Sequence, residues 1–495
     1  MLDAAFEKKG GKHMSGTGIE PVLQGAGGTA APDAGLNLPL ISAIVGVATI
    51  GGFMFGYDSG VINGTQDGLR STFQLSEAWL GITVSALLPG CALGAYAAGR
   101  LADVWGRRRV LLIAAAIFIL SAIAAGAAGS ALMMILARFV AGAGVGAASV
   151  LSPAYISEVT PAHLRGRLSS VQQVMIIAGL TGAFIANYIL AHYAGRSTEA
   201  LWLGIAAWRW MFWMQVAPAT LFLLTLLLIP ESPRYLVARG RYEQAKAVLS
   251  RLFGPVAADL KAQEIRNSIA ADHAPSFADL VSPATGKLRR IVWVGIGLAT
   301  FQQLVGINVV FYYGAVLWQA VGFSEADSLK INVLSGSLSV AACLVAMALI
   351  DRIGRKPLLL IGSIGMAATL GALTYAFSTG QFVQDRLQLA PNVATVALVS
   401  ANLYVIFFNV SWGPVMWVML GEMFPNQMRG SALAVSGAAQ WGTNFLISAS
   451  FPVLAKVLGL PITYGFYTAC AFLSIFFVVR AVHETRGREL EDMVG

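Results

Sequence analysis

The chain has 495 residues, of which 57% are hydrophobic and only 12% are charged. Soluble domains usually carry about 25% charged residues, so this composition excludes an ordinary soluble protein and indicates a chain that crosses a membrane many times. The net charge of +8 comes from basic loops, and it does not imply nucleic-acid binding.

Residues 1–38 are rich in Gly and Ala and lack the apolar core of a signal peptide. We expect them to form a disordered tail. From residue 40 onward, apolar stretches recur that are near or above the ~20 residues needed to cross the hydrocarbon core of a bilayer. They predict twelve transmembrane helices, at 40–64, 78–99, 110–128, 131–153, 170–192, 208–229, 291–318, 331–350, 358–378, 393–420, 431–454 and 461–480.

The polar stretch 230–290 separates two sets of six spans, one within 39–229 and one within 291–480. It contains amphipathic pieces, such as 242–253, in which Ala245, Leu249 and Leu252 recur at helical spacing. The sequence therefore predicts an all-α membrane protein with two six-helix bundles, short helices on the membrane surface between them, and a short tail at 481–495.

Basic residues are distributed unevenly between the two sides of these spans. Most of the 33 Lys and Arg residues fall in the tails, in 230–290 and in loops on the same side. Positively charged loops stay in the cytoplasm, so both termini are predicted to be cytoplasmic. The Ala- and Gly-rich composition and the short chain suggest a bacterial inner membrane.

Two lone charges lie inside apolar spans. Asp58 is the only charged residue between Leu38 and Gln66, and Arg138 is the only one between Val110 and Ser157. A charge at membrane depth costs at least about 2.5–3.5 kcal/mol, so it is usually paired and marks an ion or substrate path. If the first helix ends near Gln66 and the fourth begins near residue 131, both charges lie roughly 10–12 Å below the same face. We predict an Asp58–Arg138 pair whose acid takes a proton, as in a proton-coupled transporter.

The two halves repeat charged motifs on the same side of the membrane. A segment with the pattern Asp-x-x-Gly-Arg follows the second and the eighth span, and a Glu with Pro, Arg and Gly at +3, +7 and +8 follows the fourth and the tenth. Basic loops alone do not explain the Asp, Gly, Glu and Pro spacing, so parallel repeats are predicted. The charges could latch the halves together on the cytoplasmic side, or only brace the loops. They are Asp103, Arg107, Glu158, Arg165, Asp351, Arg355, Glu422 and Arg429.

Further motifs extend over about 38–490. They are GGFMFGYD at 51–58, SPAYISE at 152–158, PESPR at 230–234, FQQLVGIN at 301–308, WGPVMW at 412–417, QW at 440–441 and ETRG at 484–487. Together they resemble the sugar porter family of the major facilitator superfamily, and are similar to its bacterial proton-coupled sugar symporters. The last motif departs from the family pattern at His483 and Arg486.

The resemblance implies the major facilitator fold, transport of a hexose or pentose by alternating access, and a set of sugar contacts. Carboxamides suit such a site because they donate and accept hydrogen bonds without carrying a charge. Ser339 and Leu180 stand where related symporters carry Asn and Gln, which leaves the sugar open. The implied contacts are Gln173, Gln302, Gln303, Asn308, Gly413, Trp417 and Gln440, with Phe55, Tyr312, Trp441 and Asn444 as neighbours. The resemblance also adds Glu231 and Arg234 to the cytoplasmic charges.

The seventh span must be irregular if it holds a sugar in this way. In a regular helix Gln302 and Asn308 would lie roughly 120° apart around the axis. Gly306 lies between them, where a break is easiest, and broken helices are typical of transporter sites at mid-membrane. We therefore expect distorted backbone from Gly306 to Tyr312.

Several functions remain open. Proton symport is favoured because passive members of the family tend to have a neutral residue where Asp58 stands, and a passive facilitator is the alternative. A sugar sensor would need a signalling tail, and a drug–proton antiporter would need more buried acids. An enzyme is disfavoured, since there is no metal-binding cluster, nucleophile motif or phosphate loop, and no cofactor is expected. The expected partners are a monosaccharide, a proton and the lipid bilayer, without nucleic acid, for a protein acting as a monomer.

Overall fold

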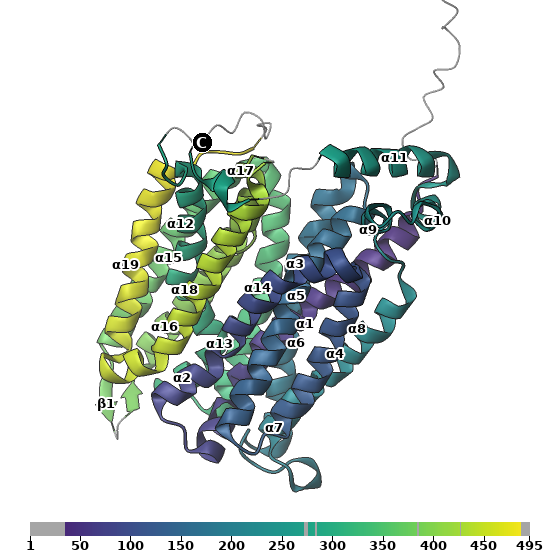
Figure 1. Cartoon of the computed structure of the whole chain (residues 1–495). Helices are drawn as coiled ribbons and strands as arrows, with labels where there is room; N and C mark the ends of the chain where they lie inside the picture. The colour runs from purple at the N-terminus through teal and green to yellow at the C-terminus, as the bar shows by residue number, and fades with distance from the viewer. Residues whose placement is uncertain (1–34, 272–275, 283–284, 384–385, 426, 487–495) are drawn as a thin grey trace, which may run out of the picture.

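The computed structural model describes residues 35–271, 276–282, 285–383, 386–425 and 427–486. Two bundles of long helices stand side by side, and a layer of short helices lies at one end of them (Figure 1). We call that end, which carries α9–α11, the linker end, and the opposite end the far end. The N-terminal half consists of α1 (Leu38–Phe73), α2 (Glu77–Ser85), α3 (Leu87–Trp105), α4 (Arg107–Gly126), α5 (Ala131–Val159), α6 (Ala162–Ala194), η1 (Trp202–Gly204), α7 (Ala207–Met214) and α8 (Val216–Leu228).

The helices of the linker and of the C-terminal half follow in the order that the sequence predicted. The linker contains α9 (Pro233–Ala238), α10 (Tyr242–Phe253), α11 (Pro255–Ala271) and η2 (Phe277–Leu280). The C-terminal half contains α12 (Arg290–Leu304), α13 (Ile307–Ala320), α14 (Glu325–Ile353), α15 (Arg355–Ser378), β1 (Gln381–Val383), β2 (Arg386–Gln388), α16 (Pro391–Val410), α17 (Trp412–Met423), α18 (Arg429–Val457) and α19 (Gly459–Ala481). The antiparallel β1–β2 hairpin between α15 and α16 was not predicted from the sequence.

Eleven segments of the described chain are long and apolar enough to cross a membrane, with α2–α3, α7–α8, α12–α13 and α16–α17 each counted as one. The twelfth long helix, α18, has 29 residues but is more polar, since it carries several Ser residues together with Gln440 and Asn444. The prediction of an all-α membrane protein is confirmed. The first span is longer than predicted, because α1 continues past Gln66 to Phe73.

Glycine lets the backbones of α1 and α6 touch. A Cβ atom at Gly56 would overlap the carbonyl oxygen of Ile176, and one at Gly60 would lie 2.8 Å from the carbonyl oxygen of Leu180. Small residues at such spacing are typical of close helix pairs in membranes, where van der Waals contact replaces the hydrophobic effect as the driving force. We call the α1 series the glycine seam; it consists of Gly52, Gly56, Gly60, Gly64 and Gly68.

The pair α3–α5 packs in the same way. Cβ atoms at Gly90 and Gly94 of α3 would overlap carbonyl oxygens of α5, and Cβ atoms at Gly142 and Gly146 of α5 would overlap carbonyl oxygens of α3. The N-terminal half is therefore held by direct contact between helix backbones. This contact fixes the positions of α1 and α5, the two helices that carry Asp58 and Arg138.

The linker helices pack against the N-terminal half. Tyr235 of α9 donates from its hydroxyl to the carbonyl of Val104 at 3.1 Å, and Arg239 donates to the carbonyls of Asp103 and Val104, each at 2.9 Å. The amide of Asn37 donates to the carbonyl of Leu252 at 2.9 Å. Residues 35–38 of the predicted N-terminal tail are thus attached to α10, whereas 1–34 lie outside the described residues.

Candidate functional site

Asp58 and Arg138 lie together in the core of the N-terminal half, with exposed fractions of 3% and 2%. The distance from Arg138 Nη1 to Asp58 Oδ2 is 4.0 Å, which allows charge attraction but is too long for a hydrogen bond. Arg138 Nη2 instead donates to the carbonyl of Val84 at 3.3 Å. The two charges are close, as predicted, but no direct hydrogen bond joins them.

Gln215 is a third member of this cluster, and it was not predicted from the sequence. It lies where α7 ends and α8 begins, is fully buried, and donates from Nε2 to Asp58 Oδ1 at 3.1 Å. The signal was weak: Gln215 is the only carboxamide in the span 208–229. Among the described residues, Asp58 Oδ2, Gln215 Oε1 and Arg138 Nε and Nη1 have no hydrogen-bond partner. Buried polar atoms are normally paired, so a cluster with four unpartnered atoms is an exception among buried groups.

Four of the implied sugar contacts form one chain of carboxamides in the C-terminal half. Gln302 Oε1 accepts from Gln303 Nε2 at 3.0 Å and from Gln440 Nε2 at 3.3 Å. Asn308 Nδ2 donates to Gln303 Oε1. Gln302 Nε2 donates to the carbonyls of Trp412 at 3.0 Å and Gly413 at 3.4 Å. Gln302, Gln303 and Gln440 are buried, and Asn308 is half-buried.

The break that brings these amides together lies at Gly306. This residue has φ 80° and ψ 21°, in the left-handed region that favours glycine, and separates α12 from α13. The hydroxyl of Tyr404 donates to the carbonyl of Val305 at 2.7 Å, and the Tyr467 ring lies where a Cβ of residue 306 would be, 2.7 Å away at its nearest atom. The predicted irregularity is present but shorter than expected, because the segment from Ile307 to Tyr312 is helical.

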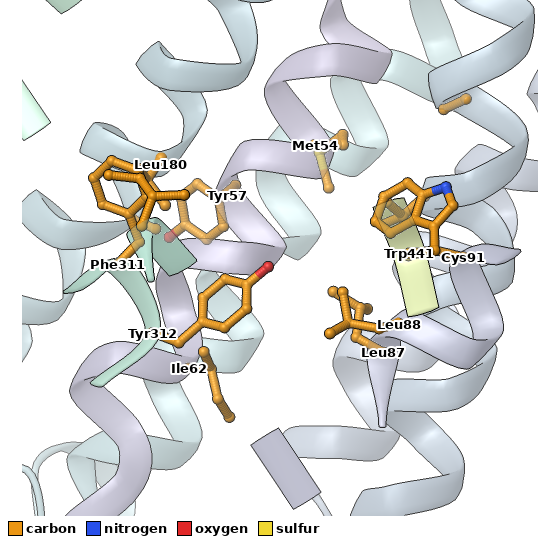
Figure 2. Packing of buried hydrophobic residues seen from close by; sticks show 14 of the residues in the cluster. Met54, Tyr57, Ile62, Leu87, Leu88, Cys91, Leu180, Phe311, Tyr312 and Trp441 are labelled. Carbon is orange, nitrogen blue, oxygen red and sulfur yellow. The ribbon is translucent and has the colours of Figure 1, made fainter. Parts of the chain in front are cut away.

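The aromatic neighbours lie where the two halves meet. The rings of Phe55 on α1 and Trp441 on α18 have centroids 5.8 Å apart, and the hydroxyl of Tyr312 lies beside Asn444. In Figure 2 the Tyr312 hydroxyl points toward the middle of the view, which Met54 and Leu88 also border. The implied neighbours therefore converge from both halves.

Two other implied contacts are more open. Trp417, with an exposed fraction of 40%, lies one helical turn after Gly413 on α17 and so extends the face that Gln302 contacts. Gln173 is half-buried on α6. Its neighbour Gln172 is buried, and both polar atoms of its amide lack a partner among the described residues; a Cβ at Gly52 would lie 2.7 Å from Gln172 Nε2.

A charge network occupies the linker end of the N-terminal half. Arg107 forms ion pairs with Asp103 at 3.0 Å and with Glu158 at 3.2 Å. Glu158 also accepts from the hydroxyl of Ser232. Glu231 accepts from the backbone amides of Arg108 at 3.1 Å and Ser232 at 2.9 Å. Arg234 lines the same small pocket as Glu158, of about 220 Å³.

The C-terminal half repeats this network. Arg355 pairs with Asp351 at 3.0 Å and with both oxygens of Glu422 at 2.7 and 3.0 Å. The hydroxyl of Thr485 donates to Glu422 at 2.6 Å. Glu484 accepts from the amides of Arg355 at 3.0 Å and Lys356 at 2.9 Å. Burial raises the pKa of Glu484, but backbone N–H groups, those of residues 355 and 356 among them, outweigh it and hold the pKa below its usual value.

The two networks match residue by residue and include one pair of motifs that was not recognised as repeated in the sequence. Glu231 and Glu484 each accept from a backbone amide at the start of the helix that follows a Gly turn, α4 or α15. The hydroxyls of Ser232 and Thr485 donate to Glu158 and Glu422, respectively. Both turns use glycine at positive φ, 98° at Gly106 and 100° at Gly354.

In the described state these contacts do not join the two halves. Each of the ion pairs just described stays within its own half, because Glu158 and Glu422 lie at helix ends next to the Arg of the same bundle. Arg429 donates to the carbonyl of Phe424 at 3.2 Å, also in its own half, and the side chain of Arg165 lies outside the described residues.

The halves are joined by polar contacts at the far end. Gln319 donates to Asp67 at 2.9 Å, and Glu325 accepts from Arg196 at 3.4 Å and from the amide of Ser197 at 2.8 Å. The two bundles diverge toward the linker end in Figure 1. The structure therefore represents a state that is closed at the far end. Within the described part of the chain, no group of three His, Cys, Asp or Glu could hold a metal ion.

Two matched six-helix halves, an amide cluster at a helix break and a buried acid–base cluster define a membrane transporter of the major facilitator type. A family model described as "Sugar (and other) transporter" matches residues 44–494. The chain belongs to this family, and it is a multi-pass membrane protein and not an enzyme.

Relatives and solved structures match this chain over nearly its whole length. A glucose transport protein of Synechocystis sp. is 48% identical over 458 residues, covering 92% of this chain and 97% of that protein. The D-xylose-proton symporter of Escherichia coli K12 is 37% identical over 490 residues, covering 92% and 96%. A partially occluded inward-open conformation of the Escherichia coli xylose transporter XylE matches with a TM-score of 0.78 at 35% identity, over 91% of this chain and 99% of that chain.

Proposed function

We propose that the protein carries a monosaccharide, a hexose or pentose, across the membrane together with a proton by alternating access. The observation that carries the proposal is the combination of two clusters, the amide chain Gln302–Gln303–Asn308–Gln440 and the buried group Asp58–Arg138–Gln215. The relatives named as a glucose transport protein and a D-xylose-proton symporter support both the sugar and the proton.

The amide chain provides the sugar site. In the described state the amides bond one another and the carbonyls of Trp412 and Gly413. Sugar hydroxyls both donate and accept, so they can replace these bonds one for one without a charge to desolvate. Trp417 supplies a flat apolar wall for the C–H face of the ring, and Phe55, Tyr312, Trp441 and Asn444 enclose it from both halves, with Gln173 on the opposite side.

Asp58 is the proton acceptor in this proposal. Arg138 favours the ionised carboxylate, and Gln215 holds one of its oxygens. Protonation of the free Oδ2 removes the attraction between Asp58 and Arg138 and so changes the balance between the two access states. Each charge that crosses the membrane with the sugar contributes about 2.3 kcal/mol per 100 mV of membrane potential, which drives accumulation.

The linker end is the cytoplasmic side in this proposal, since it carries most of the Lys and Arg residues. The described state then opens inward, and it matches the inward-open XylE structures with TM-scores of 0.78 and 0.77, against 0.74 for XylE bound to 6-bromo-6-deoxy-D-glucose. We place the protein in a bacterial inner membrane, acting as a monomer. The linker-end networks keep each bundle rigid and stabilise the state in which that end is closed.

Uptake by the purified protein in liposomes tests the function. A panel of hexoses and pentoses is offered with an imposed pH gradient, with and without an uncoupler. Symport predicts accumulation of at least one sugar above equilibrium that the uncoupler abolishes. Equilibration that the uncoupler does not change would instead make the protein a passive facilitator, and binding without uptake would make it a sensor.

A further inference from the structure

Asn63 joins the two halves through three hydrogen bonds. It lies on α1, five residues after Asp58, and only 1% of its surface is exposed. Its Nδ2 donates to the carbonyl of Phe311 at 2.7 Å, and its Oδ1 accepts from the amide of Ala315 at 3.1 Å and from Asn332 Nδ2 at 2.7 Å. Both the donor and the acceptor of the amide are therefore used across the interface between the halves.

The two backbone groups that Asn63 binds belong to one helical turn. The carbonyl of Phe311 and the amide of Ala315 are four residues apart, the spacing of a single α-helical hydrogen bond. The side chain of Asn63 thus acts directly on the backbone ladder of α13, and Gln66, one turn further along α1, donates to the next carbonyl, that of Tyr312. Gly314 makes this approach possible, since a Cβ there would lie 3.2 Å from Asn63 Nδ2 and overlap Asn332 Oδ1.

This contact joins the two helices that carry members of the functional clusters. α13 begins directly after the Gly306 break, and its second residue, Asn308, is part of the amide chain. α1 carries Asp58. A movement of α13 about Gly306 therefore either breaks the Asn63 bonds to Phe311 and Ala315 or, where they hold, moves α1, the helix that bears Asp58.

We propose that Asn63 is a positioning residue that closes the far end by binding the backbone of α13 and the side chain of Asn332, and that these bonds are released each time the far end opens. This inference rests on the proposed alternating-access function. The hydrogen bonds of this one side chain then set the balance between the state closed at the far end and the state open there.

The experiment measures how fast a buried cysteine at Leu88 is labelled. Leu88 is 1% exposed and belongs to the same buried cluster as Tyr312 (Figure 2), so a reagent applied from the far side reaches it only when that end opens. The three native cysteines, all buried, are replaced by Ala, and a membrane-impermeant maleimide is applied from the far side of sealed vesicles. Sugar counterflow is measured on the same preparations.

Asn63→Ala removes all three bonds and leaves Phe311, Ala315 and Asn332 without this partner, so labelling should become at least about tenfold faster. Asn332→Ala removes one bond and should accelerate labelling less. Asn187→Ala is the matched control, because Asn187 is also a buried amide that bonds α1, to the carbonyls of Gly60 and Val61 at 3.2 Å, but within the N-terminal half. Its labelling should stay within twofold of the parent.

Equal labelling of Asn63→Ala and the parent would overturn the inference, and so would an equal acceleration by Asn187→Ala, which would mean general loosening. If Asn63→Ala does not fold, unchanged labelling of Asn332→Ala overturns it. A parent protein that shows no counterflow would contradict the proposed function, whereas the labelling result still decides the role of Asn63.

Discussion

The two halves of the molecule repeat the same architecture but are held together by different contacts. In the N-terminal half, glycine brings helix backbones into contact along α1–α6 and α3–α5, α1 and α6 run unbroken, and the residues that separate α2 from α3 and α7 from α8, Ala86 and Gln215, keep right-handed helical dihedral angles. In the C-terminal half, the helices corresponding to the seventh and tenth spans are broken at Gly306 and Ser411, and side chains such as those of Tyr404 and Tyr467 fill the space around the first break.

This difference assigns different tasks to the halves. Backbone-to-backbone packing leaves little freedom, so it suits a buried charge cluster whose distances must be maintained. A broken helix has free backbone groups and a hinge, so it suits a site that must hold a neutral ligand and then move. The halves thus separate the proposed proton site from the proposed sugar site, and the contact of Asn63 with α13 joins them.

The largest effect is expected from filling the glycine seam. In Gly56→Ala the new methyl group would overlap the carbonyl of Ile176, so α1 and α6 must separate and folded protein should be lost. Gly437→Ala on α18 has no atom within 4 Å of the new group and should fold normally. Monodisperse yield and thermal unfolding of both variants in detergent check this. A normally folded Gly56→Ala would contradict the rigid packing of the N-terminal half.

Asp58→Asn should abolish sugar accumulation while sugar binding and counterflow remain, because the amide cannot take the proton but leaves the C-terminal amide chain intact. Uptake and counterflow in the same liposomes measure both quantities. If the variant still concentrates sugar and the uncoupler collapses that gradient, proton coupling does not depend on Asp58, and the division of tasks between the halves is wrong.

Removal of single amides in the C-terminal half should weaken sugar binding with little effect on coupling. Gln302→Ala, Gln303→Ala and Asn308→Ala should each cost about 0.5–1.5 kcal/mol of binding free energy, or up to ~3 kcal/mol where a partner is left buried and unpaired. Tryptophan fluorescence or calorimetry measures the affinity. Changes within about twofold for all three, below the ~0.5 kcal/mol of one hydrogen bond, would place the sugar elsewhere.

The linker-end networks offer a matched pair of variants. Glu158→Gln and Glu422→Gln each remove the carboxylate that binds Arg107 or Arg355, so under the proposal each shifts the protein away from the state in which the linker end is closed. Labelling of a cysteine placed between the bundles at the linker end should increase several-fold in both variants. Unchanged labelling in both would mean that these networks only brace the loops.

The smallest effect is expected from Glu484, whose pKa is held below its usual value. Because the folded pKa is the lower one, the stabilisation is complete above the unfolded value of about 4.3 and is lost as pH falls through the folded pKa. Glu484→Gln should therefore lower the unfolding temperature at pH 7, and its difference from the parent should shrink toward pH 4. A difference that does not change with pH would exclude the carboxylate as its cause.

Much of the fold could be predicted from the sequence, because spans, loops and repeats depend on local properties. Apolar length predicted the helices, and Gly306 between Gln302 and Asn308 predicted the break. Gln215 and Asn63 were not found, since an uncharged amide in an apolar span has no distinctive neighbours in sequence. The five glycines at every fourth position of α1 were present in the sequence, and their spacing could have predicted the α1–α6 contact.

The sequence by itself determined the membrane class, the two halves, and the lone charges Asp58 and Arg138, since the cost of a buried charge or of an unpaired backbone group is a property of each segment alone. Only the tertiary structure decided which groups contact these charges and one another. It set Arg138 at 4.0 Å from Asp58, gave Gln215 the hydrogen bond to Asp58, kept the ion pairs inside each half and brought Asn63 onto α13. The reason is physical: a hydrogen bond or an ion pair depends on ångström-scale distances between helices far apart in the chain, and those distances are set by how the helices pack.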